Sequence, residues 1–237
     1  MPPLICAHRG ASGYYPENSL KAFRKACELK ADSIELDVRQ TRDGQLVACH
    51  DFNLTRLYGI PRRLSEIALE EFKDFKINNL EPPAKLEEIF REIDNNMQIV
   101  LDVKENGLEK LFLHQITKFK LKDRIIVSSF DPRILATVRK LDSEIKTALI
   151  AGPFSILPLA ISICFYLRRV SEYVNADYMH LWYNKLLYKG YRTLNRWGYK
   201  LSYWTVDDPA EVCSVLKLDP HSIITNKPDL VRKIVGR

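Results

Sequence analysis

The stretch IELDVRQTRDGQLVACHD holds side chains whose types and spacing could do chemistry. Asp43-Gly44 is a strong signal for a two-residue hairpin turn with positive φ at both positions. A turn there pairs Asp37 with His50. Glu35 lies two residues before Asp37 on the same strand, so the two carboxylates leave the same face. The stretch therefore predicts two carboxylates and one imidazole on a single face. The alternative is an amphipathic edge hairpin whose polar face is merely solvated.

Charged residues also end other apolar runs of the chain. The run Leu4–Ala7 ends in His8 and Arg9, and the run IVLDVK contains Asp102 and Lys104. Asp102 and Lys104 are two residues apart, so they share one face of their strand. Because catalytic groups of α/β barrels lie where strands end, we expect these side chains to meet those of the hairpin.

Three carboxylates, those of Glu35, Asp37 and Asp102, are predicted to converge without a sulfur or clustered imidazole partner. Oxygen ligands alone suit a hard cation, Mg²⁺ or Ca²⁺, rather than zinc. Without a cation, the carboxylates would repel one another and raise one another's pKa. The sequence therefore predicts a site for one divalent cation.

Basic side chains flank this acidic group. Arg9 and Lys104 beside the cation would form an anion site, for which a phosphate is the expected guest. His8 and His50 would then be placed for proton transfers on either side of the phosphate. His180 has no such partners, and we expect it to be a core or rim histidine.

Eight apolar runs, each followed by a helical pattern, predict a closed parallel (β/α)8 barrel. Helix starts are expected at the N-cap candidates Asn18, Asp131 and Asp208. Residues 1–237 are predicted to form one domain with a small insertion at about 52–83, which includes one helical segment at 64–75. The predicted strands are ICAHRG, IELDV, IVLDVK, IIVSSF, TALIA, YMHLW, LSYWTV and IITN.

Charge and cysteine content limit the function classes. The net charge of +6 suits an anionic substrate or a polar membrane surface, but no basic run interleaved with aromatics indicates a nucleic-acid partner. The five cysteines are an odd number without CxxC spacing, which favours reduced thiols in a cytoplasmic protein over disulfides or a zinc site. The N-terminal MPPLICAHRG does not resemble a secretory signal.

The segment PFSILPLAISICFYL, residues 153–167, is the least expected feature. It is too short to span a bilayer and contains Pro158, which argues against a transmembrane helix. One interpretation is a barrel helix with a broad buried face. The other is an apolar lip, ending in Arg168 and Arg169, that makes a peripheral membrane contact through 153–169 or admits an acyl chain.

The chain resembles the glycerophosphodiester phosphodiesterase family over nearly its whole length. Each motif alone is weak, but their order and spacing together are highly specific. The matching residues are His8-Arg9-Gly10, Pro16-Glu17-Asn18, Glu35-x-Asp37, Asp43-Gly44, His50-Asp51 with Leu54, Arg56 and Gly59, Ser129-Phe130, Trp204-Thr205-Val206, and Ile223-Ile224-Thr225 with Pro228-Asp229.

The resemblance implies a barrel enzyme that cleaves a small-molecule glycerophosphodiester to sn-glycerol 3-phosphate and an alcohol. It implies that His8 and His50 form the acid/base pair. It also implies roles for the remaining residues: Glu35 and Asp37 as metal ligands, Arg9 and Lys104 as phosphate contacts, Glu17 as support for the substrate-binding groups, and Phe130 and Trp204 as pocket walls.

Two departures from the family pattern lead to further expectations. Asp102 stands where the family usually has glutamate; we retain it as a ligand, although it is one methylene shorter. Asp207-Asp208 adds acid where the family often has asparagine, which could favour a cationic alcohol group at the pocket mouth.

Two alternative functions remain open from the sequence. One is a lysophospholipase D activity, which would apply the same chemistry to lysophospholipids. The other is a non-catalytic phosphodiester-binding or membrane-adaptor protein in which Asp102 marks a decayed metal site.

Overall fold

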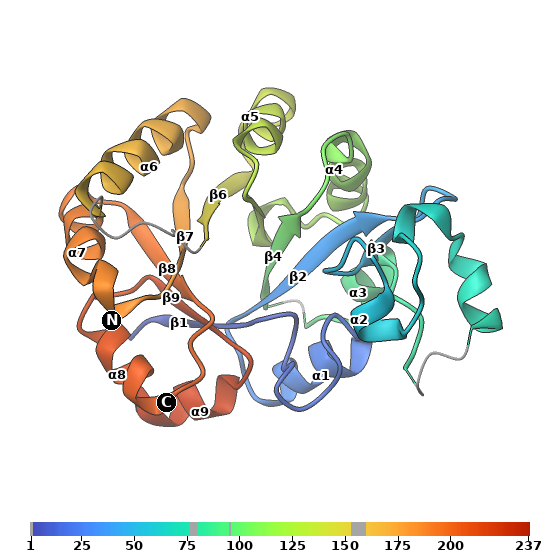
Figure 1. Ribbon diagram of the computed structural model, residues 1–237, viewed down its shortest axis with the longest axis horizontal. Coiled ribbons are helices and arrows are strands. Elements are labelled where there is room, and N and C mark those ends of the chain that lie inside the picture. Colours follow the sequence, from blue (N-terminus) through green and yellow to red (C-terminus); the bar gives the residue numbers. More distant parts are fainter. Residues whose placement is uncertain (1, 76–79, 95, 153–159) are drawn as a thin grey trace.

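Eight parallel strands close into a ring in the computed structural model, which describes residues 2–75, 80–94, 96–152 and 160–237 (Figure 1). The ring closes because β1 pairs with both β2 and β9, so the predicted (β/α)8 barrel is confirmed. An additional strand, β3, pairs antiparallel with β2. The strands are β1 (Leu4–Ala7), β2 (Ser33–Gln40), β3 (Leu46–Ala48), β4 (Gln98–Val103), β5 (Ile125–Ser129), β6 (Lys146–Ala151), β7 (Tyr178–Trp182), β8 (Lys200–Trp204) and β9 (Ser222–Thr225).

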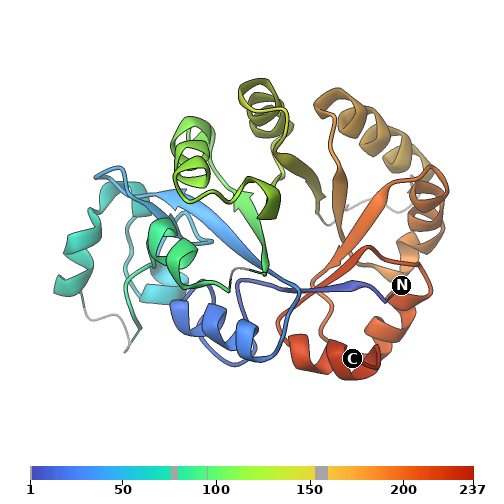
Figure 2. The same cartoon turned by 180° about the vertical axis from the view of Figure 1, so that it is seen from behind.

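Helices cover the outside of the ring, as both face views show (Figures 1 and 2). The caps predicted at Asp131 and Asp208 are confirmed, since each side chain accepts a backbone N–H and a proline follows it. The cap predicted at Asn18 is wrong, because Ser19 accepts the Ala22 N–H instead. These helices are α1 (Leu20–Glu28), α3 (Leu86–Glu92), α4 (Glu109–Lys118), α5 (Pro132–Leu141), α6 (Ala160–Val174), α7 (Tyr188–Arg196), α8 (Pro209–Leu216) and α9 (Pro228–Ile234).

Alternation along β2 separates the packed face from the chemical face. Ile34, Leu36 and Val38 are fully buried in the layer between the strands and the helices. Glu35 and Asp37 leave the opposite face, toward the inside of the barrel. Burying each aliphatic side chain contributes about 1.5–3 kcal/mol, which holds the two carboxylates in place.

The hairpin between β2 and β3 has a three-residue loop rather than the predicted two-residue turn. Gly44 takes the positive φ (80°), and its N–H donates to the Thr41 carbonyl (3.0 Å). The extra loop residue shifts the strand pairing by one position from the predicted register. The observed pairing of Val38 with Ala48 shows this shift. Asp37 therefore does not lie opposite His50, and the predicted register is wrong.

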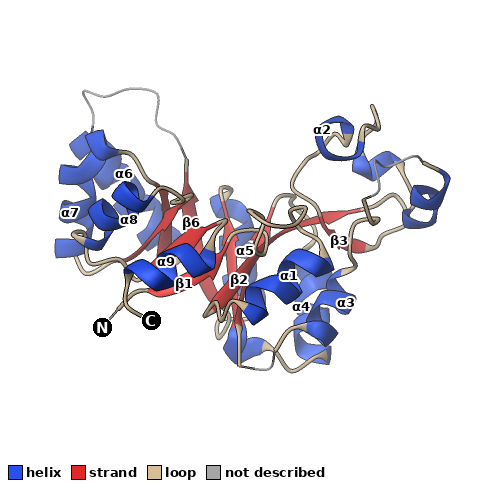
Figure 3. Ribbon diagram, turned by 90° about the horizontal axis from the view of Figure 1, so that it is seen from below, coloured by secondary structure: helices blue, strands red, loops and turns tan. Residues whose placement is uncertain are grey.

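The predicted insertion projects beside the ring, at the end of the β2–β3 hairpin (Figures 1 and 3). It contains α2 (Thr55–Tyr58) and two short 3-10 helices, Leu64–Glu66 and Leu69–Asp74, instead of one helix over 64–75. Ile67 interrupts the helix by taking an extended conformation. Its small core is separate from that of the barrel and comprises Val47, Cys49, Leu54, Tyr58, Ile60, Leu64, Ile67 and Phe72.

Part of the predicted apolar lip, residues 153–159, lies outside the described residues. The segment continues into α6, where Cys164 and Leu167 are buried, as expected for a barrel helix, and Phe165 and Tyr166 are exposed. Among the helices of the described residues, none has the length and apolar character that crossing a membrane requires.

Candidate active site

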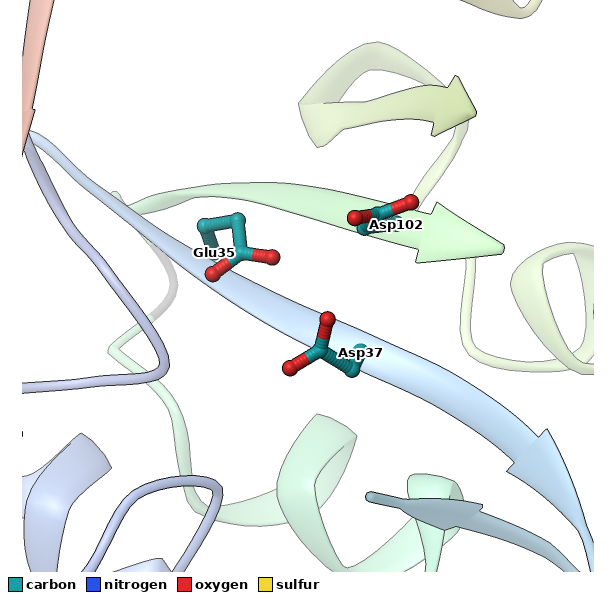
Figure 4. Close-up of side chains that lie close together, drawn as sticks. All are labelled: Glu35, Asp37 and Asp102. Carbon is teal, nitrogen blue, oxygen red and sulfur yellow. The ribbon is translucent and has the colours of Figure 1, made fainter. Parts of the chain in front are cut away.

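Three buried carboxylates from the adjacent strands β2 and β4 meet inside the barrel (Figure 4). Glu35 and Asp37 lie on β2, and Asp102 lies directly beside Asp37 on β4 because the parallel register pairs these two residues. One oxygen from each carboxylate lies within 4.8 Å of the others. The predicted convergence of Glu35, Asp37 and Asp102 is therefore present in the structure.

Two basic side chains partly balance this negative charge. Lys104 Nζ lies 2.8 Å from Asp37 Oδ1 and also contacts Asp102 Oδ2. Arg9 Nε lies 3.2 Å from Asp37 Oδ2, and the Arg9 backbone N–H donates to Glu35 Oε2 (2.8 Å). Three carboxylates thus face two cationic side chains, which favours the binding of additional positive charge.

The three carboxylates differ in acidity because their neighbours differ. Burial and the nearby Asp37 raise the pKa of Glu35 to about 8. Burial also raises the pKa of Asp102, to about 7, with Lys104 opposing and Asp37 adding to the rise. At Asp37, burial is outweighed by Lys104 and Arg9, which lower the pKa to about 2. Only Asp37 is therefore firmly anionic near neutral pH in the absence of a cation.

The carboxylate of Asp102 carries a direct sign that a cation fits here. Its Oδ1 is buried and has no hydrogen-bond partner among the described residues. A buried oxygen without a partner is costly, and a metal ion would satisfy it. Because all three side chains donate oxygen, the donor set fits a hard divalent cation.

His8 lies at the end of β1, where the barrel strands place it beside β9. Its backbone N–H donates to the Thr225 carbonyl (2.8 Å), and its Nδ1 lies 2.8 Å from Asn226 Oδ1. Burial and the adjacent Arg9 hold the pKa of His8 below its usual value. The imidazole lines the same pocket as the three carboxylates.

His50 reaches this pocket from the segment that follows β3. Its Nδ1 lies 2.8 Å from Asp51 Oδ1, and the Arg39 guanidinium donates to its backbone carbonyl (2.8 Å). Burial lowers the pKa of His50, although the nearby Asp37 and Asp51 favour the protonated ring. Both predicted histidines therefore line the pocket in spite of the shifted hairpin register.

Glu17 lies behind Arg9 rather than among the residues that line the pocket. It accepts a hydrogen bond from Arg9 Nη1 (2.9 Å) and pairs with Arg56 of α2. Arg56 also donates to Asp51 (2.6 Å), the partner of His50. This chain of ion pairs links the arginine beside the carboxylates to one of the two histidines.

Two aromatic side chains, Phe130 and Trp204, form part of the pocket wall. Phe130 and Trp204 contact edge to face with ring centroids 5.8 Å apart, and Lys104 Nζ lies 5.7 Å from the Phe130 centroid. Phe130 is half exposed. The pocket is lined by His8, Arg9, Glu35, Asp37, His50, Asp102, Lys104, Ser128, Phe130, Ile150, His180, Trp204 and Ile224.

His180 lines the same pocket but is buried, and the structure records no side-chain hydrogen bond for it among the described residues. Burial, together with His221, lowers its pKa to about 3, so it is neutral in the native state. Below pH 6.5 the unfolded chain takes up a proton that the native state refuses, so this histidine makes the protein less stable as pH falls.

Replacing His180 by phenylalanine is therefore expected to flatten the acid side of the stability profile. Between pH 6.5 and 4, the wild-type unfolding free energy should fall by about 2–3 kcal/mol more than that of His180→Phe. Urea unfolding of both proteins at a series of pH values measures this difference. Parallel curves would contradict the assignment of His180 as a buried neutral group.

Asn18 is a site residue whose role the sequence did not reveal. It is buried with a positive φ of 59°, its amide donates to Asp37 Oδ2 (2.7 Å), and its Oδ1 accepts the Asp37 backbone N–H (3.1 Å). It therefore orients a carboxylate of the acidic cluster rather than starting α1. Its place in the Pro16-Glu17-Asn18 motif was the available signal, and local helix patterning pointed elsewhere.

The two acids after β8, Asp207 and Asp208, bind backbone and side-chain groups of the protein. Asp208 caps α8 by accepting the N–H groups of Ala210 (2.9 Å) and Glu211 (3.1 Å). Asp207 is bonded to Thr225 and Asn226. Neither acid lines the pocket, and the preference for a cationic alcohol group stays a prediction.

The chain is similar in sequence and in fold to proteins of one known family. Residues 8–230 match the model of the glycerophosphoryl diester phosphodiesterase family. The chain is 30% identical to a glycerophosphodiester phosphodiesterase of Caldanaerobacter subterraneus, covering 100% of this chain and 99% of that protein. A crystal structure of the glycerophosphodiester phosphodiesterase of Thermotoga maritima is similar, with 27% identity, a TM-score of 0.81 and 98% of each chain covered. A phosphodiesterase of Oleispira antarctica, solved in complex with sn-glycerol 3-phosphate, shares the fold at 21% identity, with a TM-score of 0.82 over 99% of this chain and 97% of that one.

Proposed function

The chain belongs to the glycerophosphoryl diester phosphodiesterase family, and we propose that it hydrolyses glycerophosphodiesters to sn-glycerol 3-phosphate and an alcohol in a cation-dependent reaction. The observation that carries this proposal is one pocket lined by three clustered carboxylates, two cationic side chains and two histidines. The structurally similar phosphodiesterase of Oleispira antarctica was solved with sn-glycerol 3-phosphate, which is the product proposed here.

Glu35, Asp37 and Asp102 would hold one divalent cation, Mg²⁺ or Ca²⁺, whose charge would polarise the phosphodiester when bound. Arg9 and Lys104 retain N–H donors beyond their ion pairs, and these would bind the phosphate oxygens. Glu17 would keep the Arg9 guanidinium in position. Arg9 and Lys104 would thereby help to neutralise the negative charge that develops on the phosphate oxygens as the ester bond breaks.

His8 and His50 would move the protons. One imidazole accepts a proton from the attacking nucleophile, and the other donates a proton to the leaving alkoxide, so the reaction needs one neutral and one protonated ring. The nucleophile is water or the glycerol hydroxyl; in the second case water then opens the cyclic phosphate to give sn-glycerol 3-phosphate. Phe130 and Trp204 would form walls of the substrate pocket and limit the access of water to it. The intact pair of histidines in the pocket favours this enzyme over the non-catalytic binding or membrane-adaptor protein that the sequence left open.

A coupled assay for sn-glycerol 3-phosphate tests the proposal. The wild-type protein is incubated with glycerophosphocholine in Mg²⁺, in Ca²⁺ and in EDTA. Release of the product with a cation and its loss in EDTA is the expected result. If no product is released with either cation, from glycerophosphocholine or from a lysophospholipid, the proposal fails and the non-catalytic binding protein becomes the favoured alternative.

A lysophospholipase D activity is the second candidate, and the surface of α6 favours it. Phe165, Tyr166 and Tyr173 are exposed there, and Arg168 stacks on the Trp197 ring (5.2 Å), so the helix offers both apolar and basic groups. Such a surface suits a peripheral contact with an anionic membrane. Flotation with anionic liposomes at low salt measures this, and Phe165→Ser with Tyr166→Ser should weaken it. A wild-type protein that does not bind the liposomes would contradict the proposed membrane contact.

We also propose that residues 1–237 act as one barrel domain in the cytoplasm. The described cysteines form no disulfide, and Cys6 and Cys49 are buried thiols whose pKa burial raises to about 12. Such thiols are compatible with a reducing compartment.

A further inference from the structure

The side chain that orients His8 is itself held by a carboxylate outside the pocket. Resting on the proposed function, in which His8 transfers a proton, we propose that Asp207 is a positioning residue that acts through Asn226. By fixing the Asn226 amide, Asp207 selects the tautomer of His8 that presents an unprotonated Nε2 to the pocket.

Asp207 is bonded to two consecutive residues at the end of β9. Its Oδ1 accepts the Thr225 hydroxyl (2.7 Å) and the Asn226 backbone N–H (2.7 Å), and its Oδ2 accepts a hydrogen bond from Asn226 Nδ2. A carboxylate can only accept hydrogen bonds, so the NH₂ end of the Asn226 amide must face Asp207. This arrangement excludes the flipped amide.

The other end of the amide then determines the protonation of the ring. Asn226 Oδ1 lies 2.8 Å from His8 Nδ1 and 2.7 Å from the Ser12 hydroxyl. A carbonyl oxygen carries no hydrogen, so Nδ1 of His8 must donate its proton. In the neutral ring the lone pair therefore lies on Nε2, which is the form that can accept a proton from substrate.

The sheet brings these groups together although they are distant in sequence. Parallel pairing aligns Ala7 of β1 with Thr225 of β9, which sets His8 beside Asn226. The Val206 N–H donates to the Ile224 carbonyl (3.0 Å), and this bond sets Asp207 beside the same strand end. Together, the His8–Asn226 and Asp207–Asn226 contacts depend on three neighbouring strands, β8, β9 and β1.

The two histidines are consequently held in different ways. His50 Nδ1 faces the Asp51 carboxylate directly, and that negative charge favours an imidazolium. His8 Nδ1 faces a neutral amide, and the carboxylate of Asp207 is one residue further away. The amide fixes the tautomer and the ring orientation without adding charge beside Glu35 and Asp37.

Asp207→Asn tests the proposal, with Asp208→Asn as a control that makes the same chemical change at the next residue. Asp207→Asn frees the Asn226 amide to flip, and kcat for glycerophosphocholine should fall about 10–100-fold with KM little changed. Asp208→Asn should keep wild-type kcat, because asparagine is also a good N-cap.

The exchange variant D207N/N226D provides the rescue. The carboxylate that it introduces at position 226 can accept the His8 Nδ1 proton and a proton from the amide introduced at position 207. Every hydrogen bond of the arrangement therefore keeps a donor and an acceptor. Most of the lost activity should return. A loss in Asp207→Asn that the exchange variant does not repair would indicate a merely structural carboxylate and overturn the proposal.

Histidine ¹⁵N NMR of the folded protein measures the tautomer without reference to turnover. His8 is expected to carry its proton on Nδ1 in the wild type and in the exchange variant, and to populate both tautomers in Asp207→Asn. An unchanged tautomer in Asp207→Asn would overturn the proposal. A wild type that releases no product would instead defeat the proposed function, because the tautomer measurement stands apart from it.

Discussion

Replacing His50 by alanine is expected to lower kcat for glycerophosphodiester hydrolysis by about 10²–10⁴-fold, the range typical of a lost general acid or base. His50 lines the pocket beside Asp37, and its Nδ1 is held by Asp51 (2.8 Å), so its other ring nitrogen is directed for proton transfer. KM should change less, because Arg9 and Lys104 remain to bind the phosphate. Steady-state kinetics with glycerophosphocholine measure both constants.

The matched control for this substitution is His114→Ala. His114 is exposed on α4, outside the pocket, and its replacement should leave kcat unchanged. Since His50 is more than a third exposed, its loss should also cost little stability, which thermal unfolding checks. A His50→Ala protein with more than a tenth of wild-type kcat would contradict the acid/base role.

Removing the divalent cation has the second large expected effect. EDTA should abolish turnover, and adding Mg²⁺ or Ca²⁺ back should restore it. Because a cation that binds only the native state stabilises it, adding the preferred cation to the cation-free protein should also raise its Tm in proportion to the logarithm of concentration above Kd. This second readout does not depend on activity.

Glu35→Gln separates cation binding from folding. Its pKa of about 8 means that Glu35 is largely protonated at neutral pH without a cation, and the glutamine Oε1 can still accept the Arg9 N–H. The cation-free Tm should therefore stay near that of the wild type, while the rise in Tm with cation and the turnover are both lost. Asp123→Asn, an exposed acid outside the pocket, should retain both.

A Glu35→Gln protein that still gained stability from the cation would show that the ion binds elsewhere. A wild type that worked equally well in EDTA would remove the cation from the mechanism. In either case the cluster of Glu35, Asp37 and Asp102 would need another explanation, such as a purely structural network with Lys104.

Much of the fold could be predicted from the sequence, because burial leaves a local record. Each barrel strand is a short apolar run, and each helix that follows repeats its apolar residues at helical spacing, so the eight βα units could be identified without tertiary information. The meeting of Glu35, Asp37 and Asp102 followed, because the ends of neighbouring parallel strands lie at one face of a closed barrel. The catalytic and ligand roles of these residues stay predictions.

Only the tertiary structure decided which side chains hold the site residues. The hairpin register depended on a single loop residue, and Asn18 was placed on Asp37 by a left-handed turn before α1. Asn226 contacts His8 across 218 residues of sequence. Hydrogen bonds of this kind depend on ångström-scale positions of loops at the ends of three strands, whereas the hydrophobic pattern records only which face of each strand is buried.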